Sequence, residues 1–491
     1  MLAHFAWKSL CRPAYRRLLS AMRDPHKAQE KVLAGLLQKN AASHFGKTHS
    51  LHPRMSVREF QQSVAVSTYE DLRPLIERAA GGEPNVLTSE PVLMFETSSG
   101  STSAAKLIPY TRSLRAEFQE AIRAWIYDLY VSHSAIARGR HYWSITPLHR
   151  EQRKTSGSIP IGFDDDAEYL GRVEQWLSSK LFAVPASVGK LPDMDACLAA
   201  TREHLRKARD LRFISVWSPS FLELLLDGFE ESPAELWPDL TVVSCWGDAA
   251  SRSGYASLQK RLPGVKLQAK GLLATEGVMT IPLESLGGCV PCLHSHFYEF
   301  VRADASHGDA ETLLCDELEA GGEYSILMTT GGGLWRYRIG DRVRCVRLEG
   351  RTPILEFVGK EDGVSDLKGE KLNPHFVGRA LDALRLKHHL GTAFLMLTPS
   401  DDGASYTLLA ELGQRPAPSS LSTDLDELLQ ENPHYQYCRE LGQLDAVRIV
   451  PVSADAATRY LQRSIALGQR AGDVKPAALH RERGWEAWMK P

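Results

Sequence analysis

The sequence lacks the features that mark membrane, secreted and nucleic-acid-binding proteins. No apolar run approaches the ~18–20 residues that cross a bilayer, and 58 basic residues against 60 acidic ones give a formal net charge of −2. Without an excess of basic charge, neither nucleic acid nor a membrane surface is an expected partner. Eight cysteines in 491 residues are sparse and irregularly spaced. That usage indicates the reducing cytoplasm and not a disulfide framework.

The first 22 residues allow two interpretations. They carry four Lys or Arg residues and no acidic residue, as a mitochondrial presequence would. Apolar residues nevertheless recur at near-helical spacing and continue past Asp24-Pro25 into the segment 32–37. This continuity favours an ordinary first helix.

One cysteine pair could belong to a metal site. Cys289 and Cys292 form a CxxC motif that His294 and His296 follow, and such a group can bind zinc. No second CxxC follows at a suitable distance, and the segment continues into the strand-like run 297–301. A structural role is therefore favoured.

Strand-like runs alternate with helical patterns along most of the chain, which predicts an α/β fold with a substantial parallel component. Helical patterns cover residues 10–40, 53–80 and 114–130, and strand-like runs lie at 93–98, 213–216, 241–245, 325–329 and 341–348. A Gly-rich polar segment at 357–363 then precedes a smaller α+β pattern. We expect a large N-terminal domain, residues 1–359, and a small C-terminal domain, residues 360–491.

The first segment with chemical potential is a hydroxyl-rich loop that ends in a lysine. Residues 97–106 read TSSGSTSAAK, and no GxxxxGK[ST] motif occurs in the chain. Backbone N–H groups and hydroxyls of such a loop can donate to polyphosphate oxygens, while Lys106 supplies positive charge. A flexible polar turn is the alternative.

Three further short motifs gain meaning only together. Glu276 in GLLATEG can hold Mg²⁺, Asp341 after a Gly turn in YRIGD can accept hydrogen bonds from a ribose diol, and Lys475 in GDVKP can meet developing negative charge. Each one alone is more often a surface carboxylate, a hairpin or a solvated lysine.

The order of these motifs resembles the adenylate-forming superfamily of acyl-CoA synthetases, adenylation domains and luciferases. Within it the chain resembles the Gretchen Hagen 3 family of acyl acid amido synthetases, in their bacterial form. The closer likeness lies in residues 40–49 (NAASHFGKTH), 66–75 (VSTYEDLRPL), 106–111 (KLIPYT), 163–171 (FDDDAEYLG), 297–300 (FYEF) and 432–444 (NPHYQYCRELGQL). It extends from about residue 40 to 480.

The resemblance implies roles for individual residues. Glu276 would bind Mg²⁺, Asp341 the ribose, and Lys475 the substrate carboxylate and α-phosphate during adenylation. Lys360 and Asp362 would lie in a hinge near 360–363, about which a mobile C-terminal domain rotates. The implied ATP-binding residues are Ser98, Ser99, Gly100, Ser101, Thr102, Ser103, Lys106, Thr275, Glu276, Asp341 and Lys475.

Three positions depart from the wider pattern. Ala104 and Ala105 replace a frequent Gly and Pro in the phosphate loop, and Leu272 stands where many relatives have an aromatic residue beside adenine. Trp246, in SCWGD, is a weaker candidate for a nucleotide contact.

The resemblance implies that ATP and a carboxylic acid form an acyl-adenylate with Mg²⁺, and that an amine, an amino acid in this family, accepts the acyl group. Two alternatives stay open. An acyl-CoA ligase would share the adenylation step, and a non-catalytic adenylate-binding protein would keep the site without turnover. Neither the acid nor the acceptor can be read from the sequence.

Overall fold

The computed structural model describes residues 2–98, 106–144, 153–162, 172–191, 194–303, 311–360, 365, 367–413, 417–467, 469 and 474–489. The chain divides into two compact units. The first comprises residues 1–215, 231–244 and 265–357, and the second comprises 216–230, 245–264 and 358–491. Among the described residues, no helix is long and apolar enough to span a membrane.

The N-terminal helical pattern is two helices and not one. Helix α1 (Leu2–Arg23) ends before Asp24, whose side chain accepts a hydrogen bond from the backbone N–H of Lys27 and caps α2 (Pro25–Asn40). Pro25 fits the first turn of a helix, where its missing N–H is not needed. Trp7, Cys11 and Leu18 of α1 are buried in the core, which confirms an ordinary first helix.

The predicted helix over 53–80 is also divided. Helix α3 (His44–Thr48) precedes α4 (Val57–Ser63) and α5 (Tyr69–Ala80). Ser56 and Glu59 exchange hydrogen bonds at the start of α4, and the Thr68 backbone donates to Asp71 at the start of α5. Such capping boxes satisfy the N–H groups that a helix start leaves unpaired.

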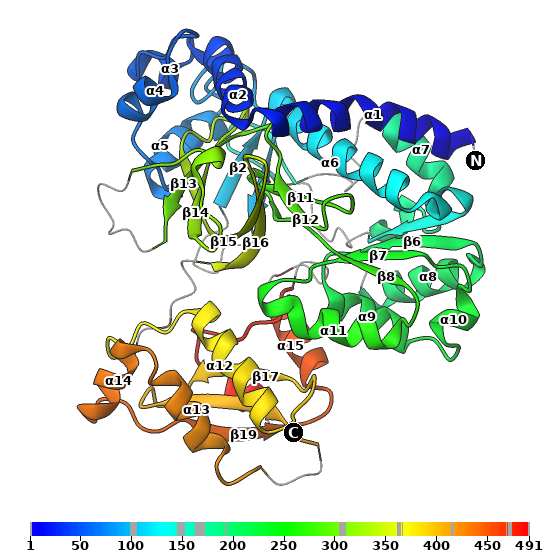
Figure 1. Cartoon of the computed structure of the whole chain (residues 1–491), viewed down its shortest axis with the longest axis vertical. Helices are drawn as coiled ribbons and strands as arrows, with labels where there is room; N and C mark the ends of the chain where they lie inside the picture. Colours follow the sequence, from blue (N-terminus) through cyan, green and yellow to red (C-terminus); the bar gives the residue numbers. More distant parts are fainter. Residues whose placement is uncertain are drawn as a thin grey trace. The chain divides into compact units, whose positions relative to one another are not determined.

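A parallel sheet follows the long helix α6 (Arg112–Ser132), which lies beside α1 (Figure 1). Its strand order is β3-β6-β7-β8, with β3 parallel to β6 and β6 parallel to β7. The predicted parallel component is therefore confirmed. Its strands are β3 (Arg140–Trp143), β6 (Leu211–Ser215), β7 (Val242–Cys245) and β8 (Lys266–Ala269). The helices between them within the first unit are α7 (Arg172–Leu181), α8 (Met194–Lys207) and α10 (Pro233–Leu236).

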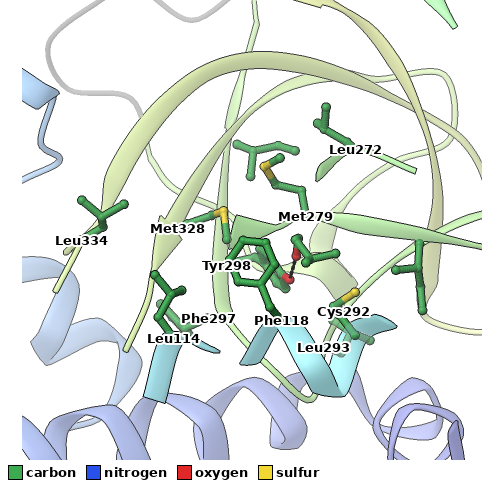
Figure 2. Packing of buried hydrophobic residues seen from close by; sticks show 14 of the residues in the cluster. Leu114, Phe118, Leu272, Met279, Cys292, Leu293, Phe297, Tyr298, Met328 and Leu334 are labelled. Atoms are coloured by element: carbon green, nitrogen blue, oxygen red, sulfur yellow. Dashed lines mark hydrogen bonds between the residues drawn. The ribbon is translucent and has the colours of Figure 1, made fainter. Parts of the chain in front are cut away.

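The first unit also contains a six-stranded sheet of order β11-β12-β16-β15-β14-β13. Its strands are β11 (Thr280–Leu283), β12 (Gly288–Pro291), β13 (Phe297–Arg302), β14 (Glu323–Thr329), β15 (Tyr337–Glu349) and β16 (Thr352–Lys360). A four-stranded sheet, β2-β1-β5-β4, contains β1 (Met94–Ser98), β2 (Lys106–Tyr110), β4 (Arg153–Lys154) and β5 (Pro160–Ile161). Helices and sheets share one apolar core, part of which Figure 2 shows around Tyr298.

The second unit has its own three-stranded sheet, β17-β18-β19, and its own apolar core. Strand β18 (Tyr406–Glu411) is antiparallel to β17 (Leu395–Pro399) and parallel to β19 (Arg448–Val452). Its helices are α9 (Pro219–Asp227), α11 (Arg252–Arg261), α12 (Pro374–Lys387), α13 (Leu421–Leu429), α14 (Pro433–Glu440), α15 (Ala456–Ala466) and α16 (Trp485–Met489). Short 3₁₀ turns occur in both units: η1 (Ser134–Arg138), η3 (Ala186–Lys190) and η5 (Cys315–Glu317) in the first, and η4 (Ala249–Ser251) in the second.

Candidate active site

The two ends of the hydroxyl-rich loop are neighbours in a β-hairpin. Strands β1 and β2 pair antiparallel, and Ser98 lies opposite Lys106 in their register. Ser99, Gly100, Ser101, Thr102 and Ser103 lie outside the described residues. The pairing fixes where the loop leaves the sheet and where it returns.

Lys106 begins β2 and is partly buried beside a buried tyrosine. Its Nζ lies 5.7 Å from the ring centroid of Tyr69, and the Tyr69 hydroxyl oxygen accepts a 2.9 Å hydrogen bond from the backbone N–H of Leu107. Tyr69 is the first residue of α5, so the capping box at Thr68 and Asp71 sets its position. Because burial raises the pKa of Tyr69, its hydroxyl stays protonated at neutral pH and the ring adds no negative charge.

The last residue of β2 connects this strand to the Thr-Glu motif. The Tyr110 hydroxyl donates a 2.6 Å hydrogen bond to the backbone carbonyl oxygen of Thr275. Thr275 and Glu276 form the two-residue turn between β9 (Leu273–Ala274) and β10 (Gly277–Val278). The structure thus brings the end of β2 and the Thr275–Glu276 turn into direct contact.

Glu276 is 7 % exposed, and close packing on one side fixes the strand that follows it. A Cβ atom added to Gly277 would lie 2.5 Å from Met328 Cε and 2.7 Å from His296 Nε2. His296 Nε2 accepts a 3.0 Å hydrogen bond from the backbone N–H of Val278. Only glycine fits at 277 without displacing these neighbours, so the backbone directly after Glu276 is closely packed.

The base of this hairpin belongs to the apolar core in Figure 2. The Tyr298 hydroxyl donates a 2.6 Å hydrogen bond to the carbonyl oxygen of Val278, and Leu272 is buried in the same cluster as Met279 and Met328. Leu272 therefore serves core packing.

Asp341 lies within a strand and not at the tip of a turn, which corrects the expected geometry. It is 3 % exposed on β15, where the pairing with β14 shifts between Ser325 and Leu327. Gly340 has φ +82°, a conformation that glycine adopts without steric cost. The motif YRIGD therefore forms a β-bulge, which re-aims the side chains around it.

A buried ion pair fixes the start of β15. Arg336 Nη2 lies 2.8 Å from Glu299 Oε1, and both side chains are almost fully buried. Arg336 also donates a 2.6 Å hydrogen bond to the carbonyl oxygen of Val64, while the backbone N–H of Arg338 donates to the carbonyl oxygen of Ser67. Removing one partner of such a pair costs about 3–5 kcal/mol of stability because the other charge is left buried.

Lys475 belongs to the second unit and is exposed. Its Nζ lies 4.4 Å from the ring centroid of Trp246, which is in the same unit. Lys360 is the last residue of β16, and Asp362 lies outside the described residues.

Sequence reasoning gave no individual role to the residues that hold this site. Tyr69 and Tyr110 occur in the segments VSTYEDLRPL and KLIPYT, whose presence supported the family resemblance. A tyrosine beside a polar turn could have indicated such a support. The atoms that these two hydroxyls contact, however, lie far away in sequence. His296 belongs to the CxxC-His segment for which the sequence favours a structural role over zinc binding, and it has a structural contact here, since its Nε2 accepts a hydrogen bond from the backbone of Val278 in β10.

The chain matches the models of one protein family along most of its length. Three family models match the chain in order: "GH3 family N-terminal domain" over residues 14–239, "GH3 family central domain" over 289–360, and "GH3 family C-terminal domain" over 377–484. Together they cover most of the chain.

Sequence relatives and solved structures agree with these matches. The chain is 22 % identical over 477 residues to indole-3-acetic acid-amido synthetase GH3.4 of Arabidopsis thaliana, covering 82 % of this chain and 79 % of the relative. The structure of GH3.15 acyl acid amido synthetase superposes with a TM-score of 0.77 at 19 % identity, covering 96 % and 94 % of the two chains. A 2-hydroxyisobutyryl-CoA ligase in its postadenylation state gives a TM-score of 0.57 at 14 % identity, covering 89 % and 88 %. These likenesses establish a shared fold.

Proposed function

The chain belongs to the GH3 family, and we propose that it is an ATP-dependent ligase that joins a carboxylic acid to an amine through an acyl-adenylate. The observation that carries the proposal is the match to all three family domains in order. The GH3 relatives named above are amido synthetases. A location in the cytoplasm stays a prediction.

The reaction has two half-reactions that balance without a redox partner. A carboxylate oxygen attacks the α-phosphorus of ATP, and the bond to pyrophosphate breaks. The amine nitrogen then attacks the carbonyl carbon of the mixed anhydride, AMP leaves, and the nitrogen loses a proton. Adenylation is needed because a carboxylate is a poor electrophile, whereas AMP is a good leaving group.

The described residues of the first unit fit the nucleotide side of this chemistry. Lys106, at the closing end of the loop 98–106, supplies positive charge for the phosphates. The turn at Thr275 and Glu276 contacts the end of the same strand through Tyr110. Asp341, on β15, is assigned to the ribose.

Glu276 fits a Mg²⁺ ligand because a carboxylate on a rigid turn is a hard oxygen donor with little conformational freedom to lose. Mg²⁺ bound there would offset the negative charge of the phosphates. The protein's own contribution is to hold the carboxylate in place.

Lys475 is assigned to the first half-reaction, where its ammonium lessens the repulsion between the attacking carboxylate and the α-phosphate. We further propose a large domain, residues 1–359, and a mobile domain, residues 360–491, with a hinge near 360–363. A separate sheet and core for β17–β19 support independent movement of the smaller part.

The test is a pyrophosphate-release screen of carboxylic acids with Mg²⁺-ATP, repeated with each amino acid and with CoA. Indole-3-acetic acid and 2,4-DB, taken from the names of relatives, are suitable first acids. We expect acid-dependent pyrophosphate release and an amide product by mass spectrometry. A thioester without amide would favour the acyl-CoA ligase, and ATP binding without pyrophosphate release with any acid would indicate a non-catalytic protein.

A further inference from the structure

The ammonium group of Lys475 lies over an indole face. Lys475 Nζ is 4.4 Å from the ring centroid of Trp246, and the Trp246 ring lies 5.9 Å from that of Trp217 at an interplanar angle of 38°. All three residues belong to the second unit. A cation at this distance from a tryptophan face is attracted by the negative potential of the ring.

The backbone of Lys475 is restrained as well. The Tyr460 hydroxyl donates a 2.8 Å hydrogen bond to the carbonyl oxygen of Lys475, and Tyr460 is itself held by stacking on Trp485, with centroids 5.1 Å apart. Pro476 follows directly, and the residue before a proline is confined to extended conformations. Lys475 is therefore restrained both at its backbone and at the ammonium group of its side chain.

Trp246 lies where the chain leaves a strand. It is the first residue after β7, a strand of the parallel sheet, and its backbone N–H donates a 2.8 Å hydrogen bond to the carbonyl oxygen of Trp217. The contact with Lys475 therefore joins two segments of the second unit that lie far apart in sequence.

We propose that Trp246 is a positioning residue that holds the ammonium of Lys475 ready for the adenylation half-reaction. This inference rests on the proposed function, in which Lys475 acts in that half-reaction. A free lysine side chain samples many rotamers, and the indole face restricts that sampling before substrate arrives. The ammonium of Lys475 covers one face of the Trp246 indole. We therefore assign Trp246 to the positioning of Lys475 and not to a contact with the nucleotide.

The experiment compares Trp246→Leu with Trp246→Phe, because leucine removes the aromatic face whereas phenylalanine keeps a weaker one. Each variant is made in the full chain, alone and with Lys475→Ala, and two rates are measured: pyrophosphate release from acid and ATP, and aminolysis of a synthetic acyl-adenylate. The matched control is Trp488→Leu. Trp488 is also a partly exposed tryptophan of the second unit that lies under a cation, with Arg463 at 5.8 Å.

We expect Trp246→Leu to slow pyrophosphate release about fivefold, as the loss of one cation–π contact predicts, and to leave aminolysis within twofold. Trp246→Phe should lie between it and the natural protein, and Trp488→Leu should change neither rate. In the Lys475→Ala background, Trp246→Leu should have no further effect on pyrophosphate release.

Several outcomes would overturn the inference and can be told apart. If Lys475→Ala leaves pyrophosphate release intact, the proposed role of the lysine fails and the inference fails with it. If Lys475→Ala is slow but Trp246→Leu is normal or faster, only the positioning role fails. A loss that persists in the double variant with a raised KM for ATP would assign Trp246 to the nucleotide.

A milder variant keeps the inference testable if Trp246→Leu does not fold. Tyr460→Phe removes only the hydroxyl that donates to the Lys475 carbonyl oxygen. We expect pyrophosphate release to fall about two- to threefold with aminolysis unchanged, because one hydrogen bond is lost and the ring stays packed. Equal losses in both rates would contradict the positioning of Lys475.

Discussion

Tyr110 in the first unit and Tyr460 in the second make the same contact to different partners. Each donates its hydroxyl to the backbone carbonyl oxygen of a residue proposed to act on ATP: Tyr110 to Thr275 and Tyr460 to Lys475. The surroundings of those two carbonyls differ. Thr275 lies in a turn whose following strand packs against His296 and Met328, whereas Lys475 is exposed and its tip lies on one indole ring.

This difference matches the demands of a two-step reaction. The nucleotide is present as ATP in the first half-reaction and as the acyl-adenylate in the second, so its ligands gain from a rigid support. Lys475 is proposed to act only in the first half-reaction and must then withdraw. A cation–π contact at a partly exposed site is worth about 0.5–1 kcal/mol, enough to bias a lysine without trapping it.

Lys475→Ala tests the proposed role of the exposed lysine in the first half-reaction and has the largest expected effect. We expect a loss on the order of 10²–10³ in the rate of pyrophosphate release, because one electrostatic contact in the transition state is removed. Aminolysis of a supplied acyl-adenylate should be spared. Lys260→Ala, on the exposed face of α11 in the same unit, is the control. Equal losses in both half-reactions would remove Lys475 from the mechanism.

Glu276→Gln tests the proposed Mg²⁺ ligand in the closely packed turn of the first unit. We expect the Mg²⁺ concentration for half-maximal pyrophosphate release to rise on the order of 10–100-fold, since an amide is a poorer ligand for a hard cation. The melting temperature should change little, because the side chains are of equal size. Glu203→Gln, exposed on α8, is the control. An unchanged Mg²⁺ dependence would show that Glu276 does not hold the metal.

The sequence predicted local features of both regions but not the contacts that distinguish them. Apolar periodicity and turn residues located β1 and α6 because these features depend on neighbours along the chain. The bulge at Gly340 was missed because it arises from the register of β15 against β14, which no local pattern encodes.

The supports of the site are also long-range. Tyr110 contacts Thr275, and Lys475 contacts Trp246, through folding that brings distant segments together. Sequence resemblance named Thr275 and Lys475, but it gave no partner for either residue. Trp246 is a weaker candidate for a nucleotide contact in the sequence because Leu272 replaces the usual aromatic residue, and no local pattern indicates that Lys475 contacts its ring.

Gly277→Ala measures how rigid the support of Glu276 is. The added methyl group would lie within 3 Å of Met328 Cε and His296 Nε2, and we expect a loss of about 1–3 kcal/mol in the free energy of unfolding. Gly35→Ala in α2 is a control of opposite sign, because its Cβ would meet no atom within 4 Å and alanine favours a helix by about 0.5–1 kcal/mol. Denaturant unfolding of both variants decides the matter, and a stable Gly277→Ala variant would contradict close packing under the turn.

The smallest expected effect comes from removing the hydroxyls of Tyr110 and Tyr460. Tyr110→Phe and Tyr460→Phe each delete one hydrogen bond, worth about 1 kcal/mol, and leave the ring in place. Because Thr275 is proposed to contact the nucleotide in both steps, Tyr110→Phe should slow both half-reactions by a similar factor, about two- to fivefold.

Tyr460→Phe should slow pyrophosphate release alone, because Lys475 is proposed to act in adenylation and not in aminolysis. Measuring both rates in both variants separates a residue that supports a shared site from one that supports a single step. The two variants should lose similar thermal stability, since the deleted bonds are alike, so a difference in melting temperature cannot account for a difference in rate pattern. If Tyr110→Phe slowed only one half-reaction, the Thr275 turn would not serve both steps, and the contrast between a rigid and a movable contact would fail.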